Sequence, residues 1–210
     1  MSVTHGLCRR QLLAAAALPA LALIPPVARA GAQVEEPMAD AVRSALSAAI
    51  ANSAPPKPVF DNIEDRLAYL KWLGEMSNRL KKRKAEHVAR VEFLETVWYE
   101  SIRAGLEASL VLGVIQVESG FRKYAISRVG ARGYMQVMPF WARLIGDGDA
   151  ARLFHMQTNL RFGCVILRHY LDRERGDLYM ALGRYNGSRG RPEYPNLVFG
   201  ARKAWAFKPA

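Results

Sequence analysis

The chain has 210 residues, half of them hydrophobic, and a formal net charge of +11. This length and composition predict one compact domain with short appendages. They exclude a small scaffold that depends on disulfide or metal staples, because a chain of this size can bury a core of its own.

Residues 1–30 have the layout of an export signal. Arg9 and Arg10 precede an apolar run from Leu12 to Ile24, and Ala28-Arg29-Ala30 offers a small-x-small cleavage site. The apolar run is too short for a permanent membrane anchor. We therefore expect cleavage after Ala30 and a periplasmic or otherwise extracytoplasmic protein, with the paired arginines as a weak hint of twin-arginine export.

Residues 31–58 are expected to be peripheral. A short amphipathic stretch from Met38 to Ile50 predicts one helix. The proline-rich residues 53–58 follow it and predict a stiff linker.

Residues 59–104 predict a helical hairpin. Asp61 and Glu64 suggest a capping box for the first helix, and residues 81–86 form a polar turn. Leucines and other apolar residues recur at helical spacing on both sides of that turn. The first helical face comprises Ile63, Leu67, Leu70, Leu73 and Leu80, and the second Val91, Leu94, Trp98 and Ile102. We interpret the hairpin as a packing scaffold, with a docking arm for an envelope protein as the alternative.

Residues 105–210 continue with helical patterns, so the fold class is mostly α. An apolar face runs through Leu110, Val111, Val114 and Ile115 and ends at Ser119-Gly120, where glycine is the usual residue past a helix end. Further helical patterns follow Pro139 and cover residues 159–171, 178–182 and 197–205. No convincing strand alternation occurs, although the glycine-rich loop 128–133 has room for a small hairpin. Cys164 has apolar neighbours and is expected to be buried.

Positive charge is concentrated in the second half of the chain. Residues 121–210 carry sixteen basic and six acidic side chains, and thirteen of the basic ones are arginine. Arginine binds carboxylates in bidentate fashion, although a solvated surface with an arginine-rich composition accounts for the pattern equally well. No basic motif is interleaved with aromatic residues, so we expect no nucleic-acid partner.

Four sequence fragments occur in a fixed order in this region: QVESGF at 116–121, SRVGARGYMQVMP at 127–139, Asn159-Leu160 with Gly163 and Tyr170-Leu171, and GRYNGS at 183–188. This series resembles the soluble lytic transglycosylases, whose lysozyme-like helical fold is related to goose-type lysozyme. The resemblance covers roughly residues 105–205. It departs at Tyr134, where leucine is usual, and at Arg184, where alanine is usual.

Glu118 is the candidate acid on physical grounds as well. A glycosidase must protonate the leaving oxygen, so its acid must hold a proton near neutral pH. The end of a helix and an apolar surrounding both raise the pKa of a glutamate. No later acidic residue stands in a recognisable motif, and Asp172 and Glu174 lie in a run of alternating charges. We therefore predict a mechanism with one carboxylate instead of the usual pair.

The resemblance implies a reaction and a set of residues. Peptidoglycan strands would be cut between N-acetylmuramic acid and N-acetylglucosamine, with Glu118 acting as acid and then as base to give 1,6-anhydro products. Tyr185 would hydrogen-bond near Glu118 and orient it. The remaining assignments are Ser119 and Asn186 lining the sugar groove, Met135 and Gln136 forming its wall, and Ser127 shaping the loop below it.

Two alternatives remain open. A hydrolase of the goose-type lysozyme kind would use water as the acceptor, and a non-catalytic peptidoglycan-binding or assembly module would not cut the strand at all. Trp141 is either a sugar-stacking side chain or part of the core. Cofactors and metals are not expected, because His155, Cys164 and His169 match no ligand spacing.

Overall fold

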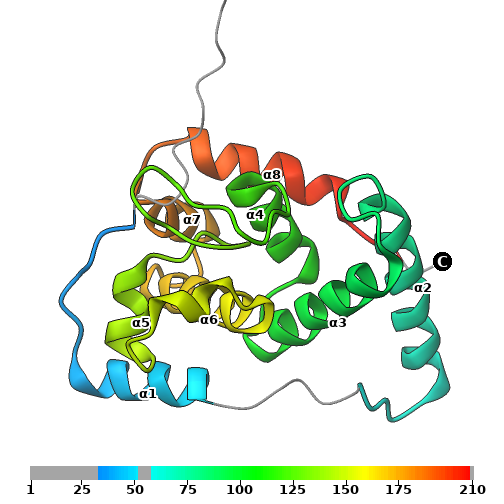
Figure 1. Ribbon diagram of the computed structural model, residues 1–210, viewed down its shortest axis with the longest axis horizontal. Coiled ribbons are helices and arrows are strands. Elements are labelled where there is room, and N and C mark those ends of the chain that lie inside the picture. The colour runs from blue at the N-terminus through cyan, green and yellow to red at the C-terminus, as the bar shows by residue number, and fades with distance from the viewer. Residues whose placement is uncertain (1–32, 52–57, 209–210) are drawn as a thin grey trace, which may run out of the picture.

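The computed structural model describes residues 33–51 and 58–208. These residues form eight α-helices and one short 3-10 helix (Figure 1), which confirms the mostly α fold class. The predicted signal peptide and most of the proline-rich linker lie outside the described residues. Within the described part of the chain, no helix is long and apolar enough to cross a membrane.

The helices follow the sequence patterns closely, with small shifts at their ends. The 3-10 helix was not predicted, and α8 begins four residues earlier than expected. The bounds are α1 Asp40–Ala51, α2 Ile63–Leu80, α3 His87–Arg103, α4 Ala108–Ser119, α5 Pro139–Ile145, η1 Ala150–Phe154, α6 Met156–Arg173, α7 Leu178–Asn186 and α8 Glu193–Ala204.

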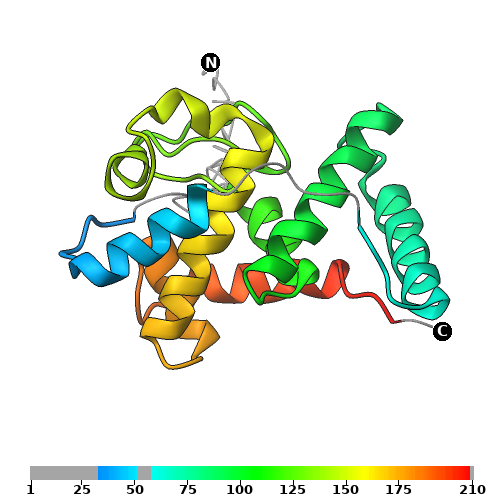
Figure 2. The same ribbon diagram turned by 90° about the horizontal axis from the view of Figure 1, so that it is seen from below.

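Helix α4 is the central element and is surrounded by the other helices (Figures 1 and 2). Its predicted apolar face is buried, and it ends at Gly120, which has the left-handed φ of 58°. Helix α8 packs directly on its backbone at Gly113, where an added Cβ would lie 3.0 Å from the backbone nitrogen of Arg202. This close packing fixes α8 against the middle of α4.

The hairpin of α2 and α3 belongs to the same core as the rest of the molecule. The predicted inner face of α2 is partly wrong, because Ile63, Leu67 and Leu70 are about half exposed, at 57%, 49% and 48%. The buried face instead comprises Tyr69, Trp72, Met76 and Leu80. Aromatic side chains bury more apolar area than leucine, and this advantage determines which side of the helix faces inward.

The first turn of α2 also differs from the prediction. Its N-cap is Asn62, whose side chain accepts a hydrogen bond from the backbone nitrogen of Asp65 at 2.7 Å. The expected capping box of Asp61 and Glu64 is therefore wrong by one residue. Asparagine caps helices as well as aspartate does, so the pattern alone could not choose between the two.

A buried ion pair joins α3 to α6. Glu100 accepts hydrogen bonds from the Arg161 guanidinium at 2.8 and 3.1 Å, and both side chains are almost fully buried. The same arginine and Arg103 donate to carbonyl oxygens of Ile50 and Ala49 at the end of α1. Positive side chains are favourable at a helix C-terminus, so these arginines hold α1 against the body.

Residues 33–39 run along the body before α1 begins, and we call them the N-terminal strap. Gln33 is only 5% exposed and accepts a hydrogen bond from the Trp141 indole at 2.9 Å. Glu36 lies 2.5 Å from Arg173 and 2.6 Å from Arg184. The expectation that this segment is peripheral is therefore wrong for the strap, because Gln33 and Glu36 tie it to α5, α6 and α7.

Candidate active site

Glu118 lies in the last turn of α4 and is 5% exposed. Its Oε1 atom accepts a hydrogen bond from the hydroxyl of Tyr194, the second residue of α8, at 2.6 Å. Its Oε2 atom is buried and has no hydrogen-bond partner among the described residues. One oxygen of the carboxyl group is therefore fixed by Tyr194, and the other is buried with its hydrogen-bonding capacity unused among the described residues.

Burial raises the pKa of Glu118 to about 8. The hydrogen bond from Tyr194 acts in the opposite direction, since it favours the ionised form, but desolvation is the larger effect. No second carboxylate is among the causes of the shift. At neutral pH the group is therefore largely protonated, as a general acid must be.

The tyrosine that contacts Glu118 is Tyr194, and the prediction that Tyr185 would do so is not supported. The Tyr185 hydroxyl donates instead to the backbone oxygen of Met135 at 2.7 Å. Tyr185 is nevertheless close enough for Glu118 to help raise its pKa, after burial as the main cause. Tyr194 was missed because the helix that carries it was expected to begin only near residue 197.

The loop between α4 and α5 is tied into a compact shape by short-range bonds. The Ser127 hydroxyl accepts a hydrogen bond from the backbone nitrogen of Ala131 at 3.0 Å. Isolated antiparallel bridges pair Arg132 with both Ile126 and Val137. Ser127 is thus bonded to the backbone of this loop, and the bridges form a small hairpin where the sequence left room for one.

Asn159 of α6 anchors the same loop through its side-chain hydrogen bonds. Its side chain accepts from the backbone nitrogen of Met135 and donates to the backbone oxygens of Arg132 and Leu153, all at 2.8 Å. It is fully buried. The Asn159 fragment of the sequence therefore positions the Met135-Gln136 segment and does not itself face an open groove.

Met135 and Gln136 are more deeply buried than a groove wall requires. The Met135 side chain is 0% exposed and lies against Gly163 of α6, so its placement in the wall is not supported. The Gln136 amide donates to the backbone oxygens of Ala125 and Gly133 at 3.1 and 2.9 Å, which fixes the loop. Because of these contacts, less of the surface of each side chain is free to contact a sugar than the resemblance implied.

Two further predicted residues are the last residues of their helices, Ser119 in α4 and Asn186 in α7. The Ser119 hydroxyl donates to the backbone oxygen of Ile115 at 3.1 Å, a bond within its own helix. Asn186 is the last residue of α7 and is 6% exposed. Trp141 is 2% exposed and packs against Phe140 and Tyr170, which supports its core interpretation.

The two departures from the family pattern both contact segments that precede α4. The Tyr134 hydroxyl accepts a hydrogen bond from Lys84 in the turn between α2 and α3, at 2.8 Å. Arg184 pairs with Glu36 of the N-terminal strap and with Glu174 at 2.6 and 2.7 Å. These two residues therefore connect the motif region to the parts of the chain that surround it.

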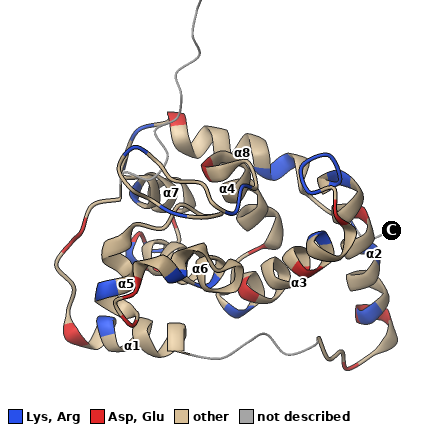
Figure 3. Cartoon of the chain, viewed as in Figure 1, with Lys and Arg blue, Asp and Glu red and all other residues tan. Residues whose placement is uncertain are grey.

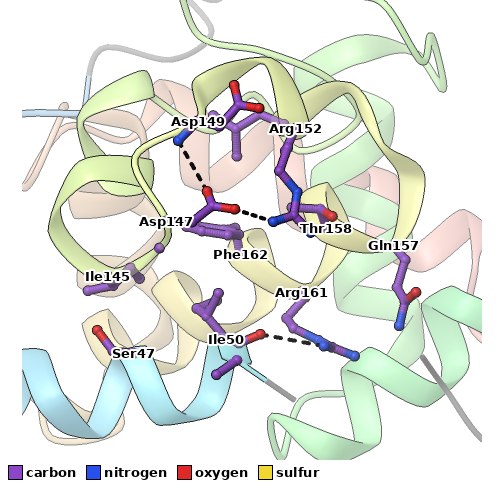
Figure 4. A pocket seen from close by; sticks show the side chains of 13 residues that line it. Ser47, Ile50, Ile145, Asp147, Asp149, Arg152, Gln157, Thr158, Arg161 and Phe162 are labelled. Atoms are coloured by element: carbon purple, nitrogen blue, oxygen red, sulfur yellow. Dashed lines mark hydrogen bonds and ion pairs between the residues drawn. The ribbon is translucent and has the colours of Figure 1, made fainter. Parts of the chain in front are cut away.

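A separate pocket of about 500 Å³ lies between α1, the α5–η1 segment and α6 (Figure 4). Its lining includes Ile50, Asp147, Arg152 and Arg161 and none of the predicted site residues. Arg152 is paired with Asp147, and Arg161 points toward the Ile50 backbone oxygen. We interpret this pocket as the space beneath α1, since its lining charges have partners within the chain.

The described residues offer no candidate metal site. Within residues 33–51 and 58–208, no group of three His, Cys, Asp or Glu side chains is arranged to hold a metal ion. Cys164 is buried, and burial raises the pKa of its thiol. A raised pKa keeps the thiol protonated and unreactive.

Comparison with known proteins identifies the family. The family model described as the transglycosylase SLT domain matches residues 97–207, which is more than half of the chain. The chain belongs to this family. The match begins inside α3, so it includes part of the second helix of the hairpin.

Relatives with related names cover the same region. A transglycosylase of Enterobacteria phage PRD1 is 35% identical over 104 residues, covering 50% of this chain and 38% of the relative. The membrane-bound lytic murein transglycosylase C of Actinobacillus pleuropneumoniae (strain L20) is 35% identical over 114 residues, covering 47% and 31%. The chain therefore spans about a third of the length of these relatives.

The chain is also similar to solved structures. One of them is an inactive mutant of the lytic transglycosylase Slt from Pseudomonas aeruginosa, with 22% sequence identity and a TM-score of 0.43. The similarity covers 67% of this chain and 27% of that one.

Proposed function

We propose that this protein is a peptidoglycan lytic transglycosylase that cuts the β-1,4 bond between N-acetylmuramic acid and N-acetylglucosamine. The observation that carries the proposal is the buried, largely protonated Glu118, with one oxygen bonded to Tyr194 and the other unpartnered. Membership of the transglycosylase SLT domain family supports the same reaction.

Glu118 serves first as the general acid. Its free oxygen donates a proton to the glycosidic oxygen, and the N-acetylglucosamine portion leaves with that proton as its new hydroxyl. The acetamido group of the muramic acid assists at the anomeric carbon while the bond breaks. The Tyr194 hydroxyl stabilises the carboxylate that remains on Glu118, because a hydrogen bond to an ionised group is stronger than one to a neutral group.

Glu118 then serves as the base. Its carboxylate takes the proton from the C6 hydroxyl of the muramic acid, and that oxygen bonds to the anomeric carbon. The ring closes to a 1,6-anhydro product, Glu118 is protonated again, and no water is consumed. The same group thus acts in both directions of proton transfer.

A hydrolase is the second candidate, and the surroundings of Glu118 weigh against it. An inverting hydrolase needs a second carboxylate as the base for water. The later acids Asp172 and Glu174 are engaged in ion pairs with arginines. Anhydro-ring formation needs one carboxylate only, so it fits the described site more simply.

Product analysis tests the proposal. Purified protein is incubated with peptidoglycan sacculi, and the released muropeptides are measured by mass spectrometry. We expect anhydro ends, which are one water lighter than reducing ends. Reducing ends alone would support the hydrolase instead. A Glu118→Gln variant is expected to release neither product, and release at the wild-type rate would contradict the role of Glu118 in either reaction. Failure of the wild type itself to release any product would favour a binding module.

The proposed location is the bacterial envelope. Residues 1–30 have the layout of an export signal, and peptidoglycan is the proposed partner. An envelope protein that docks on the α2–α3 hairpin remains a second proposed partner, which the exposed side chains of Ile63, Leu67 and Leu70 support. Cell fractionation tests the location, and recovery of the chain in the cytoplasm would contradict it.

A further inference from the structure

The turn between α2 and α3 carries four consecutive cations, Lys81, Lys82, Arg83 and Lys84. Figure 3 shows this turn as a continuous blue stretch. Arg122 and Lys123, which follow α4, are also cationic and exposed. We call these six residues the basic turn patch.

The patch adjoins the C-terminal end of α4, the helix that carries the candidate acid. Arg83 donates to the Gln116 side chain at 2.8 Å and its guanidinium lies 5.3 Å from the centre of the Phe121 ring. Arg122 donates to the backbone oxygen of Ser119, the residue after Glu118, at 2.9 Å. These contacts bring two distant parts of the sequence together at the end of α4.

The charges of the patch are not neutralised by the protein. No ion pair joins any of the six cations to a carboxylate among the described residues, whereas many arginines elsewhere are paired. Burial and, after it, the like charge of Lys123 lower the pKa of Lys84. Glu86, the acid nearest in the chain, is engaged at the start of α3 by the backbone nitrogens of Val88 and Ala89.

An arrangement of unneutralised cations at one site attracts a ligand with several negative charges. The glycan strand itself is poor in charge, but the peptide on each muramic acid carries carboxylates. That peptide projects from the sugar whose bond is cut. Because the patch adjoins the end of the helix that carries Glu118, this peptide is the charged part of the substrate that the cations suit.

We propose that the basic turn patch binds the carboxylates of the peptides carried by the glycan strand. The inference rests on the proposed function, since it names the part of the substrate that this second surface recognises. It makes the α2–α3 hairpin a contributor to substrate choice, so that strands with peptides are cut in preference to strands without them.

The test compares two substrates and two charge-reversed variants. The substrates are glycan strands with their peptides intact and the same strands stripped of peptides by an amidase. The patch variant is Lys82→Glu with Lys123→Glu, both exposed and outside the core. The control is Arg66→Glu with Lys71→Glu on the exposed side of α2, which changes the net charge equally.

We expect the patch variant to lose about tenfold in kcat/KM on peptide-bearing strands at low salt, with the loss shrinking as salt screens the charges. On stripped strands it should match the wild type, and the control should match the wild type on both substrates. An equal loss on both substrates, or no loss on either, would overturn the proposal.

A binding measurement distinguishes a failure of this proposal from a failure of the proposed function. Co-sedimentation with both kinds of strand is measured in a Glu118→Gln background, where cleavage plays no part. If the wild type cuts neither substrate, the proposed reaction fails while the binding comparison still decides on the patch. If the patch variant instead loses binding only to vesicles of anionic phospholipid, the surface recognises a membrane and the proposal is rejected.

Discussion

The environment of Glu118 combines two opposing effects on a single side chain. Burial favours the protonated form, and the bond from Tyr194 favours the ionised form. A group that must release a proton and then take one back needs both states within reach. The partner tyrosine therefore matters as much as the apolar surroundings, although only the surroundings could be inferred from neighbouring residues in the sequence.

Replacing Glu118 should reveal its pKa as a change in stability. Unfolded glutamate ionises near pH 4.5, whereas the buried group ionises at about 8. Between these values the folded state binds more protons, so stability falls as the pH rises. We expect Glu118→Gln to be more stable than the wild type by about 3 kcal/mol at pH 7, and to lose that advantage near pH 4.

Urea unfolding at several pH values measures this difference. The exposed Glu193→Gln substitution in α8 serves as the matched control and should show no such pH-dependent gain. A constant difference between Glu118→Gln and wild type from pH 4 to 8 would mean that Glu118 is not perturbed.

Removing the Tyr194 hydroxyl should move the pH profile. The hydrogen bond lowers the pKa of Glu118, so Tyr194→Phe should shift the basic limb of kcat/KM to higher pH. Loss of a hydrogen bond to a charged group should reduce kcat by about 10- to 100-fold. Tyr185→Phe is the control, since its hydroxyl bonds to Met135 instead. An unmoved basic limb in Tyr194→Phe would contradict the role given to this tyrosine.

At the scale of elements, the positions of the helices follow from sequence periodicity. Which side of each helix is buried in the core does not. Leu67 and Leu70 on α2 had the right spacing for an inner face, yet Trp72 and Met76 occupy the core. A helical pattern shows which residues share a side, and tertiary packing decides which of two apolar sides is buried. The surroundings of Met135 likewise depend on distant residues, since its backbone is bonded to Asn159 of α6 and Tyr185 of α7.

The contact between the Met135 loop and α6 depends on Gly163. A Cβ added there would lie 2.3 Å from Met135 Sδ and 2.7 Å from its Cβ, so the loop must move. We expect Gly163→Ala to destabilise the protein by about 1 to 3 kcal/mol and to lower activity. Chemical denaturation and product assays measure both effects.

Gly74 provides the matched control for that substitution. It lies in the interior of α2 with no atom within 4 Å of an added Cβ. Gly74→Ala should therefore stabilise the protein by about 0.5 to 1 kcal/mol, because alanine is the better helix former. If both variants change stability alike, the close approach of Met135 to Gly163 is not the reason why an alanine at position 163 is unfavourable.

At the scale of the whole molecule, the segments before α4 and the motif region form one unit. The sequence motifs indicated the family and the acid, since they are local and ordered. They could not reveal that Tyr134 meets Lys84, or that Arg184 meets Glu36. Contacts between residues far apart in the chain leave no periodic signal in the sequence. These contacts could therefore be found only from the structure.

The buried pair of Glu100 and Arg161 should be essential to the packing of α3 on α6. Removing one partner leaves a buried charge without compensation, so Glu100→Gln should destabilise the protein by about 3 to 5 kcal/mol. Asp172→Asn breaks the exposed pair with Arg168 and should change stability by about 1 kcal/mol or less. Thermal unfolding of both variants measures the difference, and equal small effects would show that the buried pair is dispensable.

Helix α1 has no buried residue, and two arginines hold its last carbonyls. Leu46 and Ile50 pack against the core, but a helix without a fully buried residue can detach while the core stays folded. Its amide protons should therefore exchange with solvent deuterium well before those of α4. The same detachment would expose the chain near residue 50 to proteases, so limited proteolysis should trim the protein there and leave the core from α2 onward intact.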